Sequence, residues 1–290
     1  MCREKNICFP HTIQNKWVFL PFIKQNQKLY LVMKIKDVIE FMESWAPLSL
    51  QDSYDNVGLQ VGDPEMELKG GLVCLDVTLE TLREALSIGA NLVVSHHPVL
   101  FHPLRQVCGN RLSEQIVIEA VRNNIAIYSA HTNLDNVSSG VNAVLARLLQ
   151  VHDTEPLQPL QTFPDAGSGA IGNLPSPMNG EDFLAHVKKS LRLPVLRHSR
   201  LRGKPVSRVA LCGGAGAFLI GEALRKQADA FVVGEAHYHD FVDFQDRILL
   251  LEVGHYESEC GIKSELFAKL NELFSNFAVS KKERSPYNYL

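Results

Sequence analysis

Histidine and acidic residues gather at four places in this chain, each directly after a short apolar run. Six of the eleven histidines belong to these clusters. Imidazole nitrogen and carboxylate oxygen, without thiolate, are ligands that suit transition metals such as zinc, iron, manganese or nickel. The clusters contain His96 and His97; His131 and Asp135; Glu235, His237 and His239; and His255 and Glu259. The pattern predicts a metal site built from distant parts of the chain.

The apolar runs before these clusters predict β-strands that would position the site. The runs cover residues 91–95, 125–129, 231–233 and 248–253. In open α/β sheets, ligands bind in the crevice beyond the carboxyl ends of the strands. Four strands that all deliver imidazole and carboxylate to their carboxyl ends therefore predict one shared site.

The first cluster is a pair of adjacent histidines followed by Pro98. Adjacent residues of an extended chain point to opposite sides, so His96 and His97 could serve two neighbouring metal positions. Pro98 favours the extended conformation at His97. The alternative is an ordinary histidine pair in the core or on the surface.

His255 and Glu259 are four residues apart, which places both side chains on the same face of a helix. They follow an apolar strand through Gly254 alone. The alternative interpretation is a surface ion pair. The two oxygens of a carboxylate can each bind one metal ion, and Glu259 is the best candidate for such a bridge.

The other two clusters leave more alternatives open. Asp135 is either a hard oxygen ligand or the capping residue of a turn. His131 is a ligand, a residue that orients a ligand, or a general acid or base, and the last two roles are favoured. His237 and His239 either bind metal or line the substrate side of the pocket. The glycine-rich residues 213–216 could bind an anion, although a tight turn between strand and helix is favoured.

Strands alternate with helices along the chain, which predicts a largely parallel sheet covered on both faces. Helices are expected at residues 36–45, 79–88, 112–122, 142–149, 181–191 and 218–227, with a long closing helix at 258–277. Further strands are expected at 71–75 and 206–212. Five prolines and four glycines between about residues 151 and 180 indicate a passage into a second lobe, with a strand near 170–174.

Composition excludes several classes of protein. The net charge of −3 gives no electrostatic basis for binding nucleic acid or an anionic membrane surface. No apolar run reaches the ~18 residues of a membrane span. The six cysteines form no C-x-x-C pair, which favours reduced thiols in a cytoplasmic protein. Residues 1–32 lack a sustained period and make a poor secretory signal, so we expect a poorly ordered extension upstream of a natural start at Met33.

Five segments together resemble the Nif-three-like family, whose members carry the name GTP cyclohydrolase 1 type 2 homolog. They are DNVGLQVGD (55–63), SHHPVLF (95–101), HTNLD (131–135), GEAHYHD (234–240) and GHYESE (254–259). Each motif is modest, but the ordered set is specific and runs from about residue 33 to 277. Two departures from the family pattern are Tyr54, where tryptophan is common, and His237.

The resemblance implies two similar α/β lobes, with mainly parallel sheets flanked by helices and a metal site in the cleft between them. The first lobe would comprise residues 33–155 and about 260–280, the second 156–259, and residues 281–290 would form a mobile tail. The resemblance further implies two divalent metal ions per chain, a toroidal homohexamer, and the compact form without an inserted middle domain. Its metal ligands fall on His96, His97, Asp135, His255 and Glu259.

These expectations leave two functions open. In the favoured one, the protein is a metal-dependent hydrolase of an unidentified small molecule, with proton transfer by His131, Glu235, His237 or His239. A cyclohydrolase, which opens a purine ring by hydrolysis, would fit this chemistry, as would an enzyme acting on a phosphoester or an amide. In the alternative, the same ligands serve a non-catalytic metal-binding or regulatory protein that acts through oligomer contacts.

Overall fold

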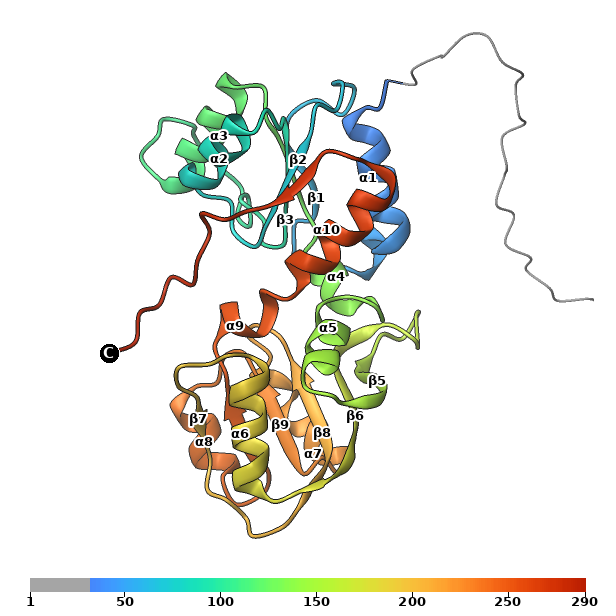
Figure 1. The fold of residues 1–290 in the computed structure, drawn as a ribbon, viewed down its shortest axis with the longest axis vertical. Coiled ribbons are helices and arrows are strands. Elements are labelled where there is room, and N and C mark those ends of the chain that lie inside the picture. Colours follow the sequence, from blue (N-terminus) through green and yellow to red (C-terminus); the bar gives the residue numbers. More distant parts are fainter. Residues whose placement is uncertain (1–31) are drawn as a thin grey trace, which may run out of the picture. The chain divides into compact units, whose positions relative to one another are not determined.

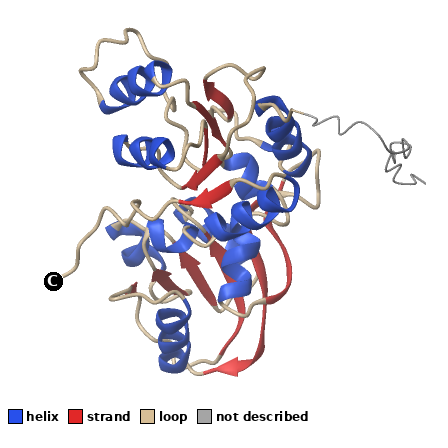
Figure 2. Cartoon of the chain, turned by 45° about the horizontal axis from the view of Figure 1, so that its top comes forward, coloured by secondary structure: helices blue, strands red, loops and turns tan. Residues whose placement is uncertain are grey.

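The computed structural model describes residues 32–290, which form a mixed α/β protein with two β-sheets (Figure 1). Helices flank the strands of both sheets (Figure 2). The expected extension at residues 1–32 lies, except for its last residue, outside the described residues. Within residues 32–290, no helix is both long and apolar enough to cross a membrane.

The first sheet has the strand order β1-β4-β3-β2-β11. The strands are β1 (Gly58–Val61), β4 (Ala126–Ser129), β3 (Leu92–Ser95), β2 (Gly71–Cys74) and β11 (Phe277–Val279). β1 is antiparallel to β4, and the other neighbours are parallel. Ser95 pairs with Cys74 on one side and with Ser129 on the other, so the carboxyl ends of β2, β3 and β4 lie level. The residues that follow these three strands therefore start from the same edge of the sheet.

The helices of the first lobe cover both faces of this sheet. They are α1 (Ile35–Trp45), η1 (Leu48–Leu50), α2 (Leu79–Ser87), α3 (Leu112–Arg122), α4 (Thr132–Asn136), α5 (Val141–Leu148) and α10 (Ile262–Leu273). In β3, Leu92 and Val94 share one core cluster with residues of α1 and α10. Val93 belongs to the cluster of α2 and α3 on the opposite face. Because both faces are covered, the strand is apolar at successive positions, as expected from its sequence.

The second sheet has the order β5-β6-β8-β9-β10-β7. The strands are β5 (His152–Pro159), β6 (Gly167–Met178), β8 (Val206–Cys212), β9 (Ala230–Val233), β10 (Leu249–Glu252) and β7 (Arg197–His198). The associated helices are α6 (Gly180–Ser190), η2 (Ala217–Leu219), α7 (Ile220–Arg225), α8 (Tyr238–Phe244) and α9 (His255–Glu259).

This second sheet corrects the expectation of mainly parallel strands, because three of its five pairings are antiparallel. Only β8, β9 and β10 form a parallel set. The short connection at residues 160–166 joins β5 to β6 as a hairpin, which forces antiparallel pairing. β5 contains Pro156 and Pro159, and its edge position explains how a strand tolerates them. Pro156 and Pro159 therefore belong to an edge strand, although the sequence around them showed no strand periodicity.

The prediction of one closing helix over residues 258–277 is wrong, because α9, α10 and β11 occupy this stretch. α9 and α10 are separated at Cys260 and Gly261. A side chain at Gly261 would place its Cβ 2.9 Å from a side-chain methyl group of Val144 in α5, so the chain turns where it packs closely against that helix. α10 then packs in the core of the first lobe, and β11 pairs with β2 (Figure 1).

Candidate metal centre

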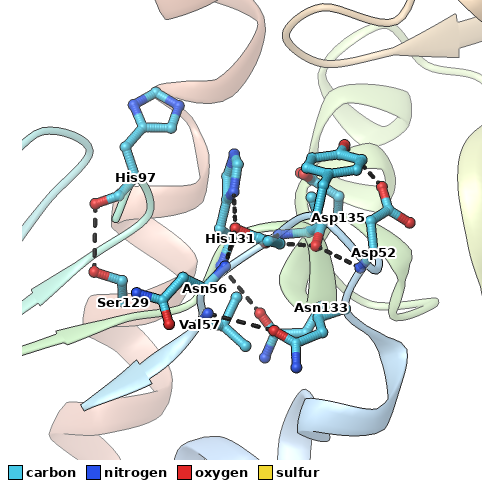
Figure 3. A network of polar contacts seen from close by, with 12 residues as sticks. Asp52, Asn56, Val57, His97, Ser129, His131, Asn133 and Asp135 are labelled. Carbon is cyan, nitrogen blue, oxygen red and sulfur yellow. Dashed lines mark hydrogen bonds and ion pairs between the residues drawn. The ribbon is translucent and has the colours of Figure 1, made fainter. Parts of the chain in front are cut away.

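The functional side chains of the first lobe follow two neighbouring strands. His96 and His97 come directly after β3, and His131 follows β4 through Ala130. Asp135 lies on the short helix α4. Because Ser95 and Ser129 are paired in the sheet, these side chains begin close together. Figure 3 shows His97, His131 and Asp135 with the polar groups that surround them, among them Ser129, whose hydroxyl lies 3.4 Å from the His97 carbonyl oxygen.

The functional side chains of the second lobe lie on α9, directly after β10. Gly254 precedes this helix with a φ of 97°, a conformation that favours glycine. A side chain there would also place its Cβ 2.2 Å from the Glu257 carboxylate. His255 and Glu259, the first and last residues of α9, are one helical turn apart and face the first lobe.

The Glu259 carboxylate lies at the centre of the imidazoles from both lobes. Its Oε2 is 3.1 Å from Nε2 of His97 and 3.2 Å from Nε2 of His255. Its Oε1 is 3.8 Å from Nε2 of His96, which in turn lies 3.6 Å from Oδ1 of Asp135. Within residues 32–290, three groups of side chains have ligand atoms close enough to hold a metal ion: His97 with His255 and Glu259; His96 with Asp135 and Glu259; and His96 with His97 and His131.

Each of the four imidazoles has its Nδ1 beside an acceptor oxygen. The Nδ1 atoms of His97, His131 and His255 lie 2.9, 2.9 and 3.0 Å from carboxylate oxygens of Asp76, Asp55 and Glu235, respectively. Nδ1 of His96 lies 2.8 Å from the carbonyl oxygen of Ala130. Since these partners can only accept, Nδ1 donates the hydrogen bond. In a neutral imidazole the lone pair of Nε2 is then available to a cation, which is the arrangement that metal-binding histidines usually have.

His96 is the clearest sign that the site fits a metal ion. Its side chain is fully buried, and its Nε2 has no hydrogen-bond partner within residues 32–290. A buried polar atom without a partner costs about 1–3 kcal/mol. This atom faces two carboxylates, and a cation between them would satisfy it.

The pKa shifts show how strongly the site favours positive charge. Burial opposes a charge on His97, but hydrogen bonds with Asp76 and Glu259 raise its pKa to about 10. Burial likewise opposes a charge on Glu259, but the close imidazoles of His255 and His97, together with the nearby imidazole of His96, hold its pKa well below the usual range. Burial dominates at Asp135 and raises its pKa. The site therefore offers a net attraction for cations, which protons or metal ions would satisfy.

The structure separates the residues expected to transfer protons. His131 lies on the wall of a cavity of about 260 Å³ that also reaches Asp135, His255 and Glu259. Glu235 contacts Nδ1 of His255 and thereby orients it. His237 and His239 are exposed at the start of α8, and neither contributes an atom to the three groups or to the cavity wall.

Two carboxylates that hold the site were missed from the sequence. Asp76 follows β2, and its place shortly before α2 is equally typical of a helix cap. Thr78 caps α2 instead, accepting a hydrogen bond from the N–H of Thr81. Asp55 lies in a loop, fully buried, and also accepts hydrogen bonds from Thr132. Nothing local in the sequence indicated this contact.

The fold and the site together define a two-sheet α/β protein that brings imidazoles and carboxylates from both sheets into one candidate metal-binding cluster. The chain belongs to the Duf34/NIF3 (NGG1p interacting factor 3) family, whose model matches residues 33–286. The resemblance based on the five motifs is thereby confirmed.

Relatives match this chain over most of their length. A "GTP cyclohydrolase 1 type 2 homolog" of Clostridium perfringens is 31% identical over 262 residues, which cover 89% of this chain and all of the relative. The "NIF3-like protein 1" of Drosophila melanogaster is 31% identical, covering 87% of this chain and 88% of its own. The crystal structure of hypothetical protein SA1388 of Staphylococcus aureus superposes with a TM-score of 0.82 at 27% identity, covering 89% of this chain and 99% of its own.

Proposed function

We propose that this protein is a hydrolase that depends on two divalent metal ions. The observation that carries the proposal is the position of Glu259, whose two oxygens face imidazoles on different sides. A carboxylate in that position can serve as a ligand shared by two ions. The orphaned Nε2 of His96 supports a second ion beside the first.

In this proposal, His97, His255 and Glu259 hold one ion, and His96, Asp135 and Glu259 hold the other. Divalent cations bound there would lower the pKa of a coordinated water and polarise the bond to be hydrolysed. Ligands of nitrogen and oxygen without thiolate suit zinc, iron, manganese or nickel.

His131 is the proposed general acid or base. Its Nδ1 donates to Asp55, which leaves Nε2 to accept or release a proton on the cavity side. Burial raises the pKa of Asp55, but hydrogen bonds from His131 and Thr132 outweigh burial and lower it well below its usual range. Asp55 therefore stays ionised and holds the imidazole in one orientation.

The substrate class is proposed from the chemistry of the site and from the name of the relatives. A cyclohydrolase opens a ring of its substrate by hydrolysis, and the name GTP cyclohydrolase 1 type 2 homolog points to a purine nucleotide. Hydrolysis of a phosphoester or an amide requires the same activated water, so both belong in the substrate screen.

The test combines metal content with turnover. Protein purified without an affinity-tag metal should carry about two ions per chain and hydrolyse a nucleotide or phosphoester when loaded with metal. His131→Ala should keep both ions but lose about 10²–10⁴-fold in rate, because only the proton transfer is removed. Asp135→Ala should lower the number of metal ions per chain from two towards one. His239→Ala, which removes an exposed histidine outside the cavity, is the matched control.

Two results would contradict the proposal. A ratio well below two ions with all five ligands intact would count against the dinuclear centre. A parent protein that is saturated with metal but turns over no substrate would favour a non-catalytic metal-binding or regulatory protein. In that case His131→Ala would have the same metal content as the parent and would likewise show no turnover.

Location and assembly are part of the same proposal. The described cysteines Cys74, Cys108, Cys212 and Cys260 are all free, which supports a reducing compartment such as the cytoplasm. We also propose a homohexamer, which the family resemblance suggests, and light scattering should then give six times the mass of one chain.

A further inference from the structure

Residues 280–283, directly after β11, are tied to the first lobe by hydrogen bonds, and three of them belong to the expected mobile tail of residues 281–290. Ser280 is buried, and its N–H donates to the carbonyl of Val73 in β2. Its hydroxyl donates to Glu84 of α2 at 2.6 Å, and the N–H of Lys281 donates to the same carboxylate at 2.8 Å. The residues that follow are thereby directed towards the end of β2.

This anchored segment places Glu283 beside the turn that follows β2. Its side chain is only 3% exposed. Oε2 accepts a hydrogen bond of 2.7 Å from the Nζ of Lys263 in α10. Oε1 accepts hydrogen bonds from the backbone N–H groups of Leu75 and Asp76, the two residues directly after β2. Both oxygens are thus used, and two N–H groups beyond the end of the strand obtain a partner.

The turn at Leu75 and Asp76 contacts His97 in two ways. The carbonyl oxygen of Leu75 accepts a 2.9 Å hydrogen bond from the backbone N–H of His97. The carboxylate of Asp76 accepts one of 2.9 Å from Nδ1 of the His97 ring. Glu283 therefore holds one side of this turn while His97 contacts the other.

The same network reaches the helix that carries the other ligands. Lys263 also donates to the hydroxyl of Tyr256 at 2.9 Å. Tyr256 lies on α9 between His255 and Glu259. The C-terminal segment is consequently linked to the ligands of both lobes, through Asp76 in one and through Tyr256 in the other.

We infer that Glu283 is a positioning residue for the metal centre, which acts by fixing the turn from which Asp76 orients His97. This inference rests on the proposed metal-binding function. Partners that orient a metal-binding histidine typically contribute 10- to 100-fold to metal affinity. Glu283 is one step further away and reaches the histidine through Asp76, so an effect near the lower end of that range is expected.

The test measures Zn²⁺ affinity of the full-length chain by competition with a chromogenic chelator, together with the melting temperature. Glu283→Ala should bind Zn²⁺ about 10-fold more weakly than the parent. Glu283→Gln keeps an acceptor for the two N–H groups but loses the charge opposite Lys263. It should retain most of the affinity while melting at a lower temperature. Glu65→Ala, which removes an exposed carboxylate between Lys34 and Lys36 in the same lobe, should leave the affinity unchanged.

A double-mutant cycle separates positioning from a general loss of stability. Asp76→Ala and the double variant Asp76→Ala/Glu283→Ala should bind Zn²⁺ equally weakly, because Glu283 acts through Asp76. If Glu283→Ala does not fold, Glu283→Asp takes its place. This shorter side chain keeps the charge but cannot reach Lys263 and both N–H groups together, and it should show a smaller loss of affinity.

The outcomes distinguish this inference from the proposed function. A parent chain that binds neither Zn²⁺ nor another divalent cation overturns the metal centre and the role of Glu283 together. A parent that binds Zn²⁺, with Glu283→Ala or Glu283→Asp binding it equally well, overturns the role of Glu283 alone. Additive losses in the double variant, or affinities that simply follow the melting temperatures, also overturn it.

Discussion

Gly214 shows how closely the backbone of the second lobe approaches the candidate metal ligands. A side chain there would place its Cβ 2.3 Å from Oε1 of Glu259 and 3.3 Å from Nε2 of His255. Its φ of 62° also lies in the left-handed region, which favours glycine. The glycine-rich run at 213–216 was interpreted as a tight turn or an anion site. The position of Gly214 indicates a further structural role for this run, because a glycine there leaves room for the Glu259 carboxylate.

Gly214→Ala should weaken metal binding, because the added methyl group collides with the Glu259 carboxylate. Gly203→Ala is the matched control, since Gly203 has a similar φ of 67° but no atom within 4 Å of the added carbon. Both changes should cost about 1–2 kcal/mol in stability from the backbone conformation. Only Gly214→Ala should lower Zn²⁺ affinity in a chelator competition. Equal affinity in the two variants would show that Glu259 can move aside without loss.

Among the elements, the strand ends of the first sheet decide where the ligands begin. Cys74, Ser95 and Ser129 are neighbours across β2, β3 and β4. A slip of one residue between β3 and β4 would turn each side chain to the opposite face. The buried hydroxyls of Ser95 and Ser129 lie 2.8 Å apart and bond to each other, which supports the observed register.

Helix α2 contributes a tether for the C-terminal segment through Glu84. Hydrogen bonds from Ser280 and from the backbone of Lys281 and Lys282 outweigh burial and lower the pKa of Glu84 from its usual value of 4.5. A lowered carboxyl pKa in the folded state stabilises the protein above pH ~4.5, and this contribution is lost as the pH falls through the lowered pKa.

The free energy of unfolding of Glu84→Gln should therefore be lower than that of the parent at pH 6, by up to about 1 kcal/mol because Glu84 is partly exposed. The difference should shrink as the pH falls below ~4.5 and through the lowered pKa. Urea unfolding of both proteins between pH 3 and 6 measures it. A difference that does not vary with pH would indicate that Glu84 has the same pKa in the folded and unfolded chain.

For the whole molecule, the candidate metal ligands come from two lobes that have separate cores. His96, His97 and Asp135 come from the first lobe, and His255 and Glu259 follow the second sheet. A metal ion bound between them would contact both lobes. It would bind the folded chain in preference to the unfolded one and stabilise it by mass action.

Removal of metal with a chelator should consequently lower the melting temperature. At a free metal concentration of about 100 times Kd, the lost stabilisation is about 2.7 kcal/mol, which corresponds to several degrees for a protein of this size. Glu259→Ala should melt at the same temperature with and without the chelator. If the parent shows no shift while it demonstrably loses metal, the ions do not bind preferentially to the folded state.

Much of the fold could be predicted from local patterns. The strand at 206–212 and the helix at 112–122 were predicted with their observed bounds, because hydrophobic periodicity depends on neighbouring residues alone. The strand-end pattern also identified the histidines and acids that meet at Glu259. Local patterns did not predict the places where the chain reverses its direction. These are the hairpin of β5 and β6, the break between α9 and α10, and strand β11, which all depend on packing or pairing with distant segments.

At the candidate site, too, the sequence indicated the features that depend on local residues and not those that depend on contacts between distant segments. The amino-acid sequence nominated His96, His97, Asp135, His255 and Glu259 among its candidate ligands, because imidazoles and carboxylates stand out after apolar strands, and the family resemblance reduced the candidates to these five. It did not indicate that Asp55, Asp76 and Glu283 hold the ligands in place. Those contacts join residues 76, 21 and 207 positions apart, and they exist only because the folded chain brings their partners within hydrogen-bonding distance.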